Sequence, residues 1–339
     1  MDEILLHEYQ ATHSMQVCIL GATGFIGGHI ARAAHARGWQ VRATRRKPGF
    51  AGAIPDVPVE WVQANLNDVT SLRNAMRDCE ILFHAAATYP QDFRHIDAEV
   101  KQATTEMRNV LQAAQAEGVR RVIYTSSLSC LGPSGDESTS YTPGSIRSAY
   151  YEAKFAMEQL ALQFAKDNDL DIVVLLPAAV FGPGDIKPTT GVIIREAALG
   201  RVPVYFDATI NAVDARDVAQ AHINAVQHGQ RGERYLIGGH NITLYEFLSL
   251  IARCAGRKPP RIQLSRNMVK RLVQIADALP FVSLPENFRT FEQWRSLNDA
   301  KAHQTLGYTV RPLEVTVRDT LEWFRAQHQR MGSGPSADE

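Results

Sequence analysis

Residues 16–46 read QVCILGATGFIGGHIARAAHARGWQVRATRR: an apolar run, a glycine-rich turn, a helical pattern and a second apolar run. Glycines in such a turn let the backbone approach a phosphate group, and the helix that follows aims its first N–H groups at the same place. This strand–turn–helix setting is typical of dinucleotide binding, whereas glycines alone would fit an ordinary structural turn. The predicted cofactor contacts here are Gly21, Thr23, Gly24, Phe25, Ile26 and Gly27.

The end of the second strand indicates which dinucleotide binds. NAD is usually held there by an acidic side chain that accepts hydrogen bonds from a ribose, whereas arginine accommodates the 2′-phosphate of NADP. This chain has Arg45 and Arg46 at that point. We therefore expect NADP or NAD as the cofactor, with NADP preferred. The alternative is that the two arginines belong to a solvated loop.

Composition disfavours several classes of protein. The 339 residues contain 36 Lys plus Arg and 36 Asp plus Glu, so the whole-chain charge predicts neither a nucleic-acid nor a membrane partner. The four cysteines are too scattered for metal-ligand spacing, which favours a reducing compartment. No apolar run approaches the roughly 18 residues of a membrane span, and residues 1–14 do not resemble a signal peptide. We expect a cytoplasmic protein with a flexible leader at 1–14 and a disordered tail at 331–339.

Strand and helix patterns alternate along the first half of the chain, as in a doubly wound parallel α/β sheet. The predicted strands are 59–62, 81–85, 122–125 and 172–176, and the predicted helices between them are 69–78, 98–117 and 149–166. We predict a Rossmann domain over 15–178, to which 211–228 returns. Residues 179–210 and 229–330 are predicted to form a smaller, mainly helical substrate lobe over the carboxyl ends of the strands.

Tyr150 and Lys154 lie four residues apart in a predicted helix, so their side chains project from one face. A phenol is too weak an acid to exchange protons near neutrality, and a nearby ammonium lowers a phenol's pKa by stabilising the phenolate. Ser127 follows a buried strand, where its hydroxyl is placed to hold a substrate oxygen. Each pattern alone also fits an ordinary helix or turn, and Tyr151 is a rival phenol. Together, after a dinucleotide motif, they favour Ser127, Tyr150 and Lys154 as catalytic residues.

These motifs resemble those of the extended short-chain dehydrogenase/reductases, in particular the NAD-dependent epimerase/dehydratase group. Further matches are FHAAA at 83–87, YTSS at 124–127, Pro177 to Asp185, DARDVA at 214–219 and GERYLIGG at 232–239. They are similar to the hopanoid-associated sugar epimerase and dihydroflavonol reductase-like branches. The resemblance implies the same catalytic serine, tyrosine and lysine, and a homodimer formed by the helices that begin near Ala98 and Ala149. It also implies these cofactor contacts: Asn65, Leu66, Ala85, Ala86, Ala87, Thr125, Tyr150, Lys154, Pro177, Ala179 and Val180.

The chain departs from the family pattern at several positions. Asn65 stands where an aspartate usually holds the adenine, and Ala103 stands where an asparagine usually helps a proton relay. Glu106 replaces a customary glycine, and Leu176 stands where many sugar epimerases carry an arginine or asparagine. Ile210–Val213 replaces a stretch typical of sugar-nucleotide binders. We expect the relay to run through water or the activity to be altered, and the substrate stays open.

Three functions fit these observations. The first is epimerisation of a nucleoside-diphosphate sugar, in which hydride is removed and then returned to the opposite face of a keto intermediate. The second is NADPH-dependent reduction of a carbonyl compound, which the two arginines support better. The third is a regulator that senses NADP without catalysis. The resemblance favours the epimerase, with a sugar nucleotide as the small-molecule substrate.

Other polar and aromatic residues have simpler interpretations. His84 is as well explained by packing beside the sheet as by a cofactor contact. Asp214, Asp217 and His222 share one predicted helix, but without further ligands no metal site is predicted. The aromatic side chains of the lobe are better explained by core packing than by substrate contact; they are Phe281, Phe288, Phe291 and Trp294.

Overall fold

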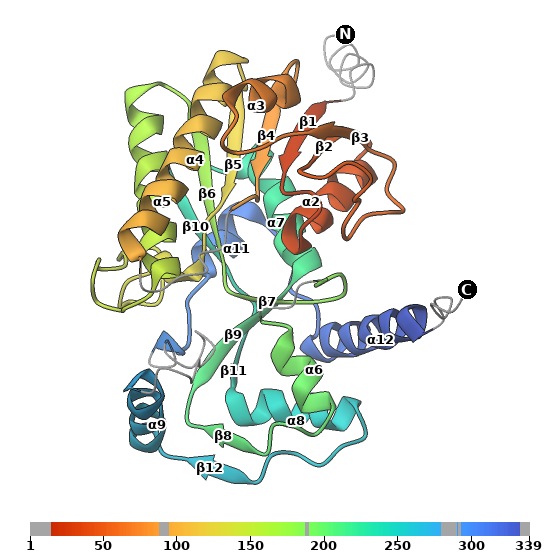
Figure 1. Ribbon diagram of the computed structural model, residues 1–339, viewed down its shortest axis with the longest axis vertical. Helices are drawn as coiled ribbons and strands as arrows, with labels where there is room; N and C mark the ends of the chain where they lie inside the picture. Colours follow the sequence, from red (N-terminus) through yellow and green to blue (C-terminus); the bar gives the residue numbers. More distant parts are fainter. Residues whose placement is uncertain (1–14, 88–94, 187–189, 279–289, 291–292, 333–339) are drawn as a thin grey trace.

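The structure, a computed structural model, describes residues 15–87, 95–186, 190–278, 290 and 293–332 (Figure 1). At its centre is a seven-stranded parallel sheet with the strand order β3-β2-β1-β4-β5-β6-β10. The strands are β1 (Gln16–Leu20), β2 (Gln40–Arg45), β3 (Glu60–Gln63), β4 (Ile81–His84), β5 (Arg121–Thr125), β6 (Asp171–Pro177) and β10 (Arg234–Ile237). The predicted Rossmann-type fold is confirmed.

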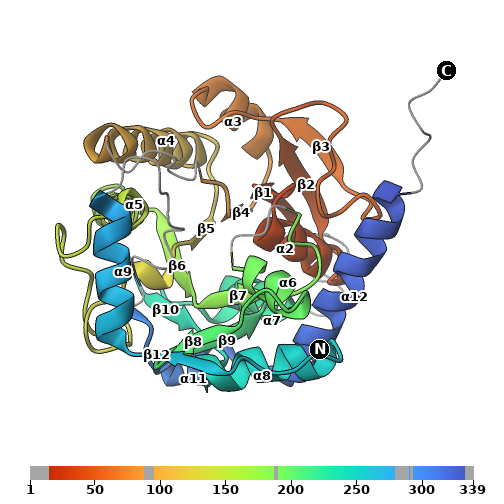
Figure 2. The same cartoon turned by 60° about the horizontal axis from the view of Figure 1, so that its bottom comes forward.

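Helices cover both faces of this sheet (Figures 1 and 2). One layer contains α3 (Val69–Met76), α4 (Ile96–Ala116) and α5 (Ala149–Asp167), and the other contains α2 (Phe25–Ala36), α7 (Ala215–His228) and α11 (Ala300–Leu306). The central strands are apolar on both faces because helices bury both of them. The side chains from Val17 to Leu20 and from Ile172 to Leu176 are buried throughout.

A smaller lobe lies at the carboxyl ends of the large sheet's strands (Figure 1). It contains a sheet of β7 (Ala179–Phe181), β9 (Thr209–Asp214) and β11 (His240–Thr243), and a second sheet of β8 (Val204–Phe206) and β12 (Ile262–Leu264). The lobe's helices are α6 (Val192–Ala198), α8 (Leu244–Cys254), α9 (Arg266–Ala278) and α12 (Leu313–Gly332). An apolar core of its own, which includes Phe181, Phe247 and Ile251, holds this lobe together.

The chain divides between the two units at other places than the sequence predicts. β10 pairs with β6 in the large sheet, and α11 packs against β10 and α7 of the same unit, although the sequence places residues 229–330 in the lobe. β9 pairs with β7 and β11 in the small sheet, whereas residues 211–228 are predicted to return to the large domain; only α7 does so. The reason is that a short apolar strand carries no local sign of which sheet it will join. At the other end, α12 continues to Gly332, two residues into the predicted tail.

Some predictions concern residues that the structure does not describe: the leader at 1–14, the tail beyond Gly332, and Phe281, Phe288 and Phe291. Trp294 is described, and its ring lies 5.6 Å from that of Phe206 in the lobe's core. Among the described helices, none has both the length and the apolar character of a membrane span. Within the same residues, no group of three or more His, Cys, Asp or Glu side chains is arranged to hold a metal ion.

Candidate active site

The glycine-rich turn lies between β1 and α2, beside the end of β4. Gly21 has a φ of +89°, and a Cβ atom on it would lie 2.8 Å from the backbone of Ala85. A Cβ atom on Gly27 would lie 2.2 Å from the carbonyl oxygen of Gly21. Larger residues at either position would force the turn away from the helix and the neighbouring strand. Glycine is therefore required at both positions by the packing of the turn against its own helix and the neighbouring strand.

The start of α2 is suited to an anion. Its N-cap residue is Gly24, which supplies no side-chain cap, and the first turn of the helix holds no acidic residue. The first N–H groups and the positive end of the helix dipole therefore meet no neutralising side chain of this helix. Phe25 and Ile26 occupy the first two helical positions. This arrangement fits the pyrophosphate of a dinucleotide.

Two arginines stand at the end of β2. The guanidinium of Arg45 lies 5.3 Å from the ring centre of Trp61 on the adjacent β3, and Arg46 is exposed. Arg42, earlier on the strand, forms an ion pair with Glu60 at 2.9 Å, so its charge is not available to a ligand. The end of this strand is where the adenosine part of a dinucleotide lies in this fold. Arg45, the last residue of β2, and Arg46, which follows it, are therefore the arginines placed to meet a phosphate at that edge.

Two positions that depart from the family pattern, Asn65 and Glu106, make local polar contacts. The side-chain oxygen of Asn65 accepts a hydrogen bond from the N–H of Asn67 at 3.1 Å. Glu106 is buried in α4 and accepts hydrogen bonds from Asn67 at 3.3 Å and from Gln102 at 3.1 Å. Ala103 is also buried and contributes no polar group. The carboxylate of Glu106 is thus satisfied within the fold.

The catalytic candidates meet between the end of β5 and the start of α5. The phenol of Tyr150 donates a hydrogen bond to the hydroxyl of Ser127 at 3.1 Å. The Ser127 oxygen also accepts a bond from the N–H of Ser129 at 3.1 Å, so both of its lone pairs are used and its hydrogen remains to donate. Tyr151, the rival phenol, is buried with its ring 5.6 Å from that of Tyr141. The fold therefore brings Tyr150 to Ser127.

Lys154 lies one turn after Tyr150 in α5. Its ammonium donates a hydrogen bond to the carbonyl oxygen of Thr125 at 3.4 Å and lies 5.9 Å from the ring centre of Tyr124. Burial lowers the pKa of Lys154 below its usual range, although the nearby acidic groups of Cys130 and Glu158 oppose this shift. The strand end that carries Ser127 therefore also holds the lysine.

His84 ends β4 beside these groups. Its ring stacks on that of Tyr124 at 5.5 Å, and neither ring nitrogen has a hydrogen-bond partner within the described structure. Burial, assisted by the positive charge of Lys154, lowers the pKa of His84 to about 3. The ring is therefore neutral and packed, which favours the packing interpretation over a cofactor contact.

A buried ion pair supports the end of β5 from behind. Glu158, one turn beyond Lys154, lies 2.8 Å from the guanidinium of Arg234 on β10 and accepts a short hydrogen bond from Ser126. Arg234 also donates to the carbonyl oxygen of Cys130 at 3.0 Å. Burial raises the pKa of Glu158, although Arg234 and Ser126 act in the opposite direction. Sequence reasoning missed this pair; the one available signal was the spacing of four between Lys154 and Glu158.

His222 of α7 holds the same strand end from the other face of the sheet. Its Nδ1 lies 2.8 Å from the carbonyl oxygen of Val218, and its Nε2 lies 2.8 Å from the hydroxyl of Thr125. A carbonyl oxygen only accepts, so Nδ1 carries the hydrogen and Nε2 accepts from Thr125. Burial lowers the pKa of His222 to about 4. A neutral imidazole thus fixes the residue whose carbonyl binds Lys154.

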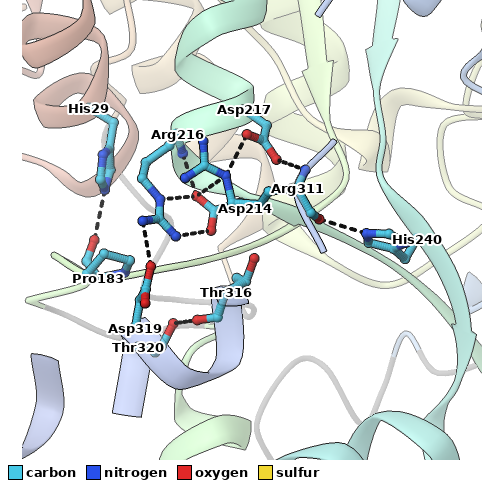
Figure 3. Close-up of polar contacts among 10 residues, drawn as sticks. All are labelled: His29, Pro183, Asp214, Arg216, Asp217, His240, Arg311, Thr316, Asp319 and Thr320. Carbon is cyan, nitrogen blue, oxygen red and sulfur yellow. Dashed lines mark hydrogen bonds and ion pairs between the residues drawn. The ribbon is translucent and has the colours of Figure 1, made fainter. Parts of the chain in front are cut away.

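A charged network joins the lobe to the large sheet (Figure 3). Asp214 ends β9 and caps α7 by accepting a hydrogen bond from the N–H of Arg216 at 2.8 Å. The guanidinium of Arg216 binds both oxygens of Asp214, at 2.9 and 2.8 Å, and reaches Asp319 of α12 at 2.6 Å. Burial raises the pKa of Asp214, but the bonds from Arg216 outweigh this and hold that pKa below its usual value. Asp217 pairs in turn with Arg311 at 2.7 Å, so both carboxylates are engaged by arginines.

His29 makes a second link between the two units (Figure 3). It lies on α2, the helix that follows the glycine-rich turn, and its Nε2 is 2.8 Å from the carbonyl oxygen of Pro183, just after β7. Burial lowers the pKa of His29, which favours a neutral ring that donates from Nε2. The helix that follows the glycine-rich turn is therefore bonded to the segment that leads into the lobe.

Comparison with known proteins assigns this chain to a family. The model of the NAD-dependent epimerase/dehydratase family matches residues 17–238, from β1 to the end of β10. This chain belongs to that family. The match covers the glycine-rich turn, the contact between Tyr150 and Ser127, and Asp214, Arg216 and Asp217 of the charged network, but not their partners Arg311 and Asp319.

Three similar proteins extend the family match over nearly the whole chain. A putative dihydroflavonol 4-reductase from Synechocystis is 32% identical over 324 residues, which cover 91% of this chain and 94% of the relative. The solved structure of the protein gox2253 has a TM-score of 0.82 and 32% identity, and it covers 94% of this chain and 99% of its own. A nucleoside-diphosphate-sugar epimerase from Pseudomonas aeruginosa has a TM-score of 0.80 and 25% identity, covering 93% and 99%. The proteins similar to this chain therefore include one described as a putative reductase and one described as an epimerase.

Proposed function

We propose that this chain is an NADPH-dependent reductase of a carbonyl compound. The observation that carries the proposal is the hydrogen bond of 3.1 Å between Tyr150 and Ser127, formed at the same edge of the sheet as the glycine-rich turn. A proton donor and a hydroxyl that holds an oxygen are what the reduction of a carbonyl group requires. Ser127, Tyr150 and Lys154 are the residues to which we assign catalysis.

Each of these residues has a distinct part in the reaction. NADPH, held at the glycine-rich turn and Arg45, would supply the hydride that the carbonyl carbon accepts. The Ser127 hydroxyl donates a hydrogen bond to the carbonyl oxygen and fixes its position. Tyr150 transfers its phenolic proton to that oxygen as negative charge develops, which yields the alcohol, and solvent then returns a proton to the phenolate. Lys154 stabilises that phenolate through its positive charge.

Two observations favour reduction over epimerisation of a sugar nucleotide. Arg45 and Arg46 suit the 2′-phosphate of NADPH, the cofactor that reductases consume and exchange. In the lobe, both polar groups of the Asn211 side chain are already bonded within the protein. Its oxygen accepts a hydrogen bond from the N–H of Gly239 at 2.8 Å, and its amide donates one to Asn241 at 3.0 Å. The segment 210–213 therefore adds no charged group for a diphosphate. The Synechocystis relative, described as a putative dihydroflavonol 4-reductase, supports the same choice.

The test is NADPH consumption with a panel of aldehydes and ketones. We expect stoichiometric loss of NADPH with at least one of them, and a fall in kcat of about 10²- to 10⁴-fold in Tyr150→Phe. The matched control is Tyr151→Phe, which removes the adjacent hydroxyl and should leave kcat within about threefold of the wild type. Equal losses in both variants would show that Tyr150 is not the proton donor.

Epimerisation stays the second candidate, because the Pseudomonas aeruginosa protein of similar structure is described as a nucleoside-diphosphate-sugar epimerase. In that case the purified protein would retain oxidised cofactor, and sugar nucleotides would interconvert without net change in cofactor absorbance. A regulator that only senses NADP would bind the cofactor tightly and show no turnover in either Tyr150→Phe or the wild type.

A further inference from the structure

The charge of the chain is unevenly distributed. Although acidic and basic residues are equal in number over 339 residues, the segment 247–276 contains seven basic residues and no Asp or Glu. These residues are Arg253, Arg257, Lys258, Arg261, Arg266, Lys270 and Arg271. The segment runs from α8 through β12 into α9, and the arginines and lysine that precede β12, at 257, 258 and 261, are exposed. The balanced total, which predicts no membrane partner, conceals this local excess of positive charge.

The same segment exposes large apolar side chains. Nine such side chains are exposed in the described part of the chain, and four of them belong to this segment: Ile262 (54% exposed), Met268 (50%), Leu272 (50%) and Ile275 (58%). The last three are spaced by four and three residues in α9, so they form one stripe along the helix. Val269 and Val273 lie on a different side of α9 and pack on the lobe's core. The helix is thus attached by one side and presents an apolar stripe on another.

Both features lie at one end of the molecule. In Figure 1, β12 and α9 form an outer margin of the lobe, away from the large sheet and its glycine-rich turn. β12 pairs with β8 alone, so its other edge is open within the described structure. We call this margin, made of residues 257–275, the basic–apolar margin.

We propose that the basic–apolar margin binds the surface of an anionic lipid bilayer. A helix with an apolar stripe and flanking basic residues lies in the membrane interface, where the stripe enters the acyl boundary and the cations meet lipid phosphates. A second copy of the chain is a poorer occupant, because a two-fold contact through this margin would bring its excess positive charges against themselves. Single-stranded nucleic acid is also poorer, since it favours aromatic stacking platforms, whereas the exposed side chains here are aliphatic.

The experiment is co-sedimentation of the full-length protein with lipid vesicles. We expect binding to vesicles of phosphatidylcholine with phosphatidylglycerol, and at least about tenfold weaker binding to phosphatidylcholine alone. Raising the ionic strength to about 1 M, where the Debye length is about 3 Å, should release most of the protein. Absence of binding to the anionic vesicles would overturn the proposal.

Two sets of variants test the two components of the margin. Replacement of Met268, Leu272 and Ile275 by Gln should weaken vesicle binding about tenfold, whereas the same replacement of exposed Phe50, Leu199 and Val315 should not. Charge reversal to Glu at Arg257, Lys258 and Arg261 should also weaken it at least about tenfold, whereas reversal at exposed Arg77, Lys166 and Arg325 should not.

The remaining outcomes are equally decisive. Equal losses of vesicle binding in the variant and control sets would show that total charge or nonspecific hydrophobic adsorption, rather than the basic–apolar margin, controls binding. If sedimentation equilibrium shows that the Gln variant of α9 loses a dimer that the wild type forms, the margin is a protein interface and the proposal fails. Thermal unfolding of every variant, together with NADPH binding, shows whether the large domain remains folded.

Discussion

Arg45 has the stacking and charge needed to select a cofactor. Its guanidinium lies over Trp61, 5.3 Å from the ring centre, an arrangement in which an arginine is held by a cation–π contact while its N–H donors point outward along the plane. A lysine could not reproduce this geometry, because it lacks the planar fork. Arg46 adds a second exposed cation next to it.

Replacing Arg45 by Asp should weaken NADPH binding about 10- to 100-fold, because a charge-assisted bond to the 2′-phosphate contributes about 1.5–3 kcal/mol. Binding of NADH, which has no such phosphate, should change far less. Fluorescence titration of both cofactors measures the two effects, with exposed Arg77→Asp as the control for net charge. Equal losses for NADPH and NADH would mean that Arg45 does not contact the 2′-phosphate.

Several residues of the site could be found from the sequence because their signals are local. The glycines at 21, 24 and 27, Ser127 after its strand, and the spacing of Tyr150 and Lys154 are all visible within a single element and its end. The support behind them could not be found in this way. Glu158 and Arg234 can form their ion pair only because β10 joins the large sheet next to β6. No local sequence pattern predicts that β10 will pair with β6.

At the scale of single elements, α5 matters most. Tyr150, Lys154 and Glu158 follow one another at spacings of four, so one helical face carries the proton donor, the ammonium and the buried carboxylate. Ser148 caps the helix by accepting from the N–H of Tyr151 at 3.2 Å, which sets the helical phase of all three. A change in the packing of this helix would therefore move the whole group together.

Glu158→Ala should destabilise the fold by about 3–5 kcal/mol, because it leaves the charge of Arg234 buried without a partner. Urea unfolding measures this loss. Gln159→Ala, at the exposed neighbouring position on α5, should stay within about 0.5 kcal/mol of the wild type. A loss below 1 kcal/mol in Glu158→Ala would show that water or a rearranged side chain compensates Arg234.

At the scale of the whole molecule, the buried histidines make stability depend on pH. Burial lowers the pKa of His84 to about 3 and that of His222 to about 4, both below the value of about 6.5 for a histidine in an unfolded chain. At pH values between the folded and the unfolded pKa of each histidine, the unfolded chain binds more protons than the folded one. The free energy of unfolding therefore falls as the pH is lowered through about 6.5. At pH about 5 each histidine should remove about 2 kcal/mol from the free energy of unfolding.

His84→Phe tests this dependence while keeping a ring in place. Between pH about 7 and about 5, its free energy of unfolding should fall by about 2 kcal/mol less than that of the wild type. Exposed His35→Gln is the control and should follow the wild-type curve. Parallel curves for His84→Phe and the wild type would show that His84 is not held neutral by burial. The homodimer through α4 and α5 and the cytoplasmic location stay predictions.

Asp214 has a consequence for anyone who exchanges parts between relatives. Asp214 is the last residue of β9 in the small sheet, and its carboxylate also caps α7 on the large sheet. Its partner Arg216 is bonded to Asp319 of α12, near the end of the chain. A lobe taken from a relative therefore could not replace this one at a single backbone position without breaking these contacts. A chimera would have to inherit Asp214, Arg216 and Asp319 as a set, although they come from two distant stretches of sequence.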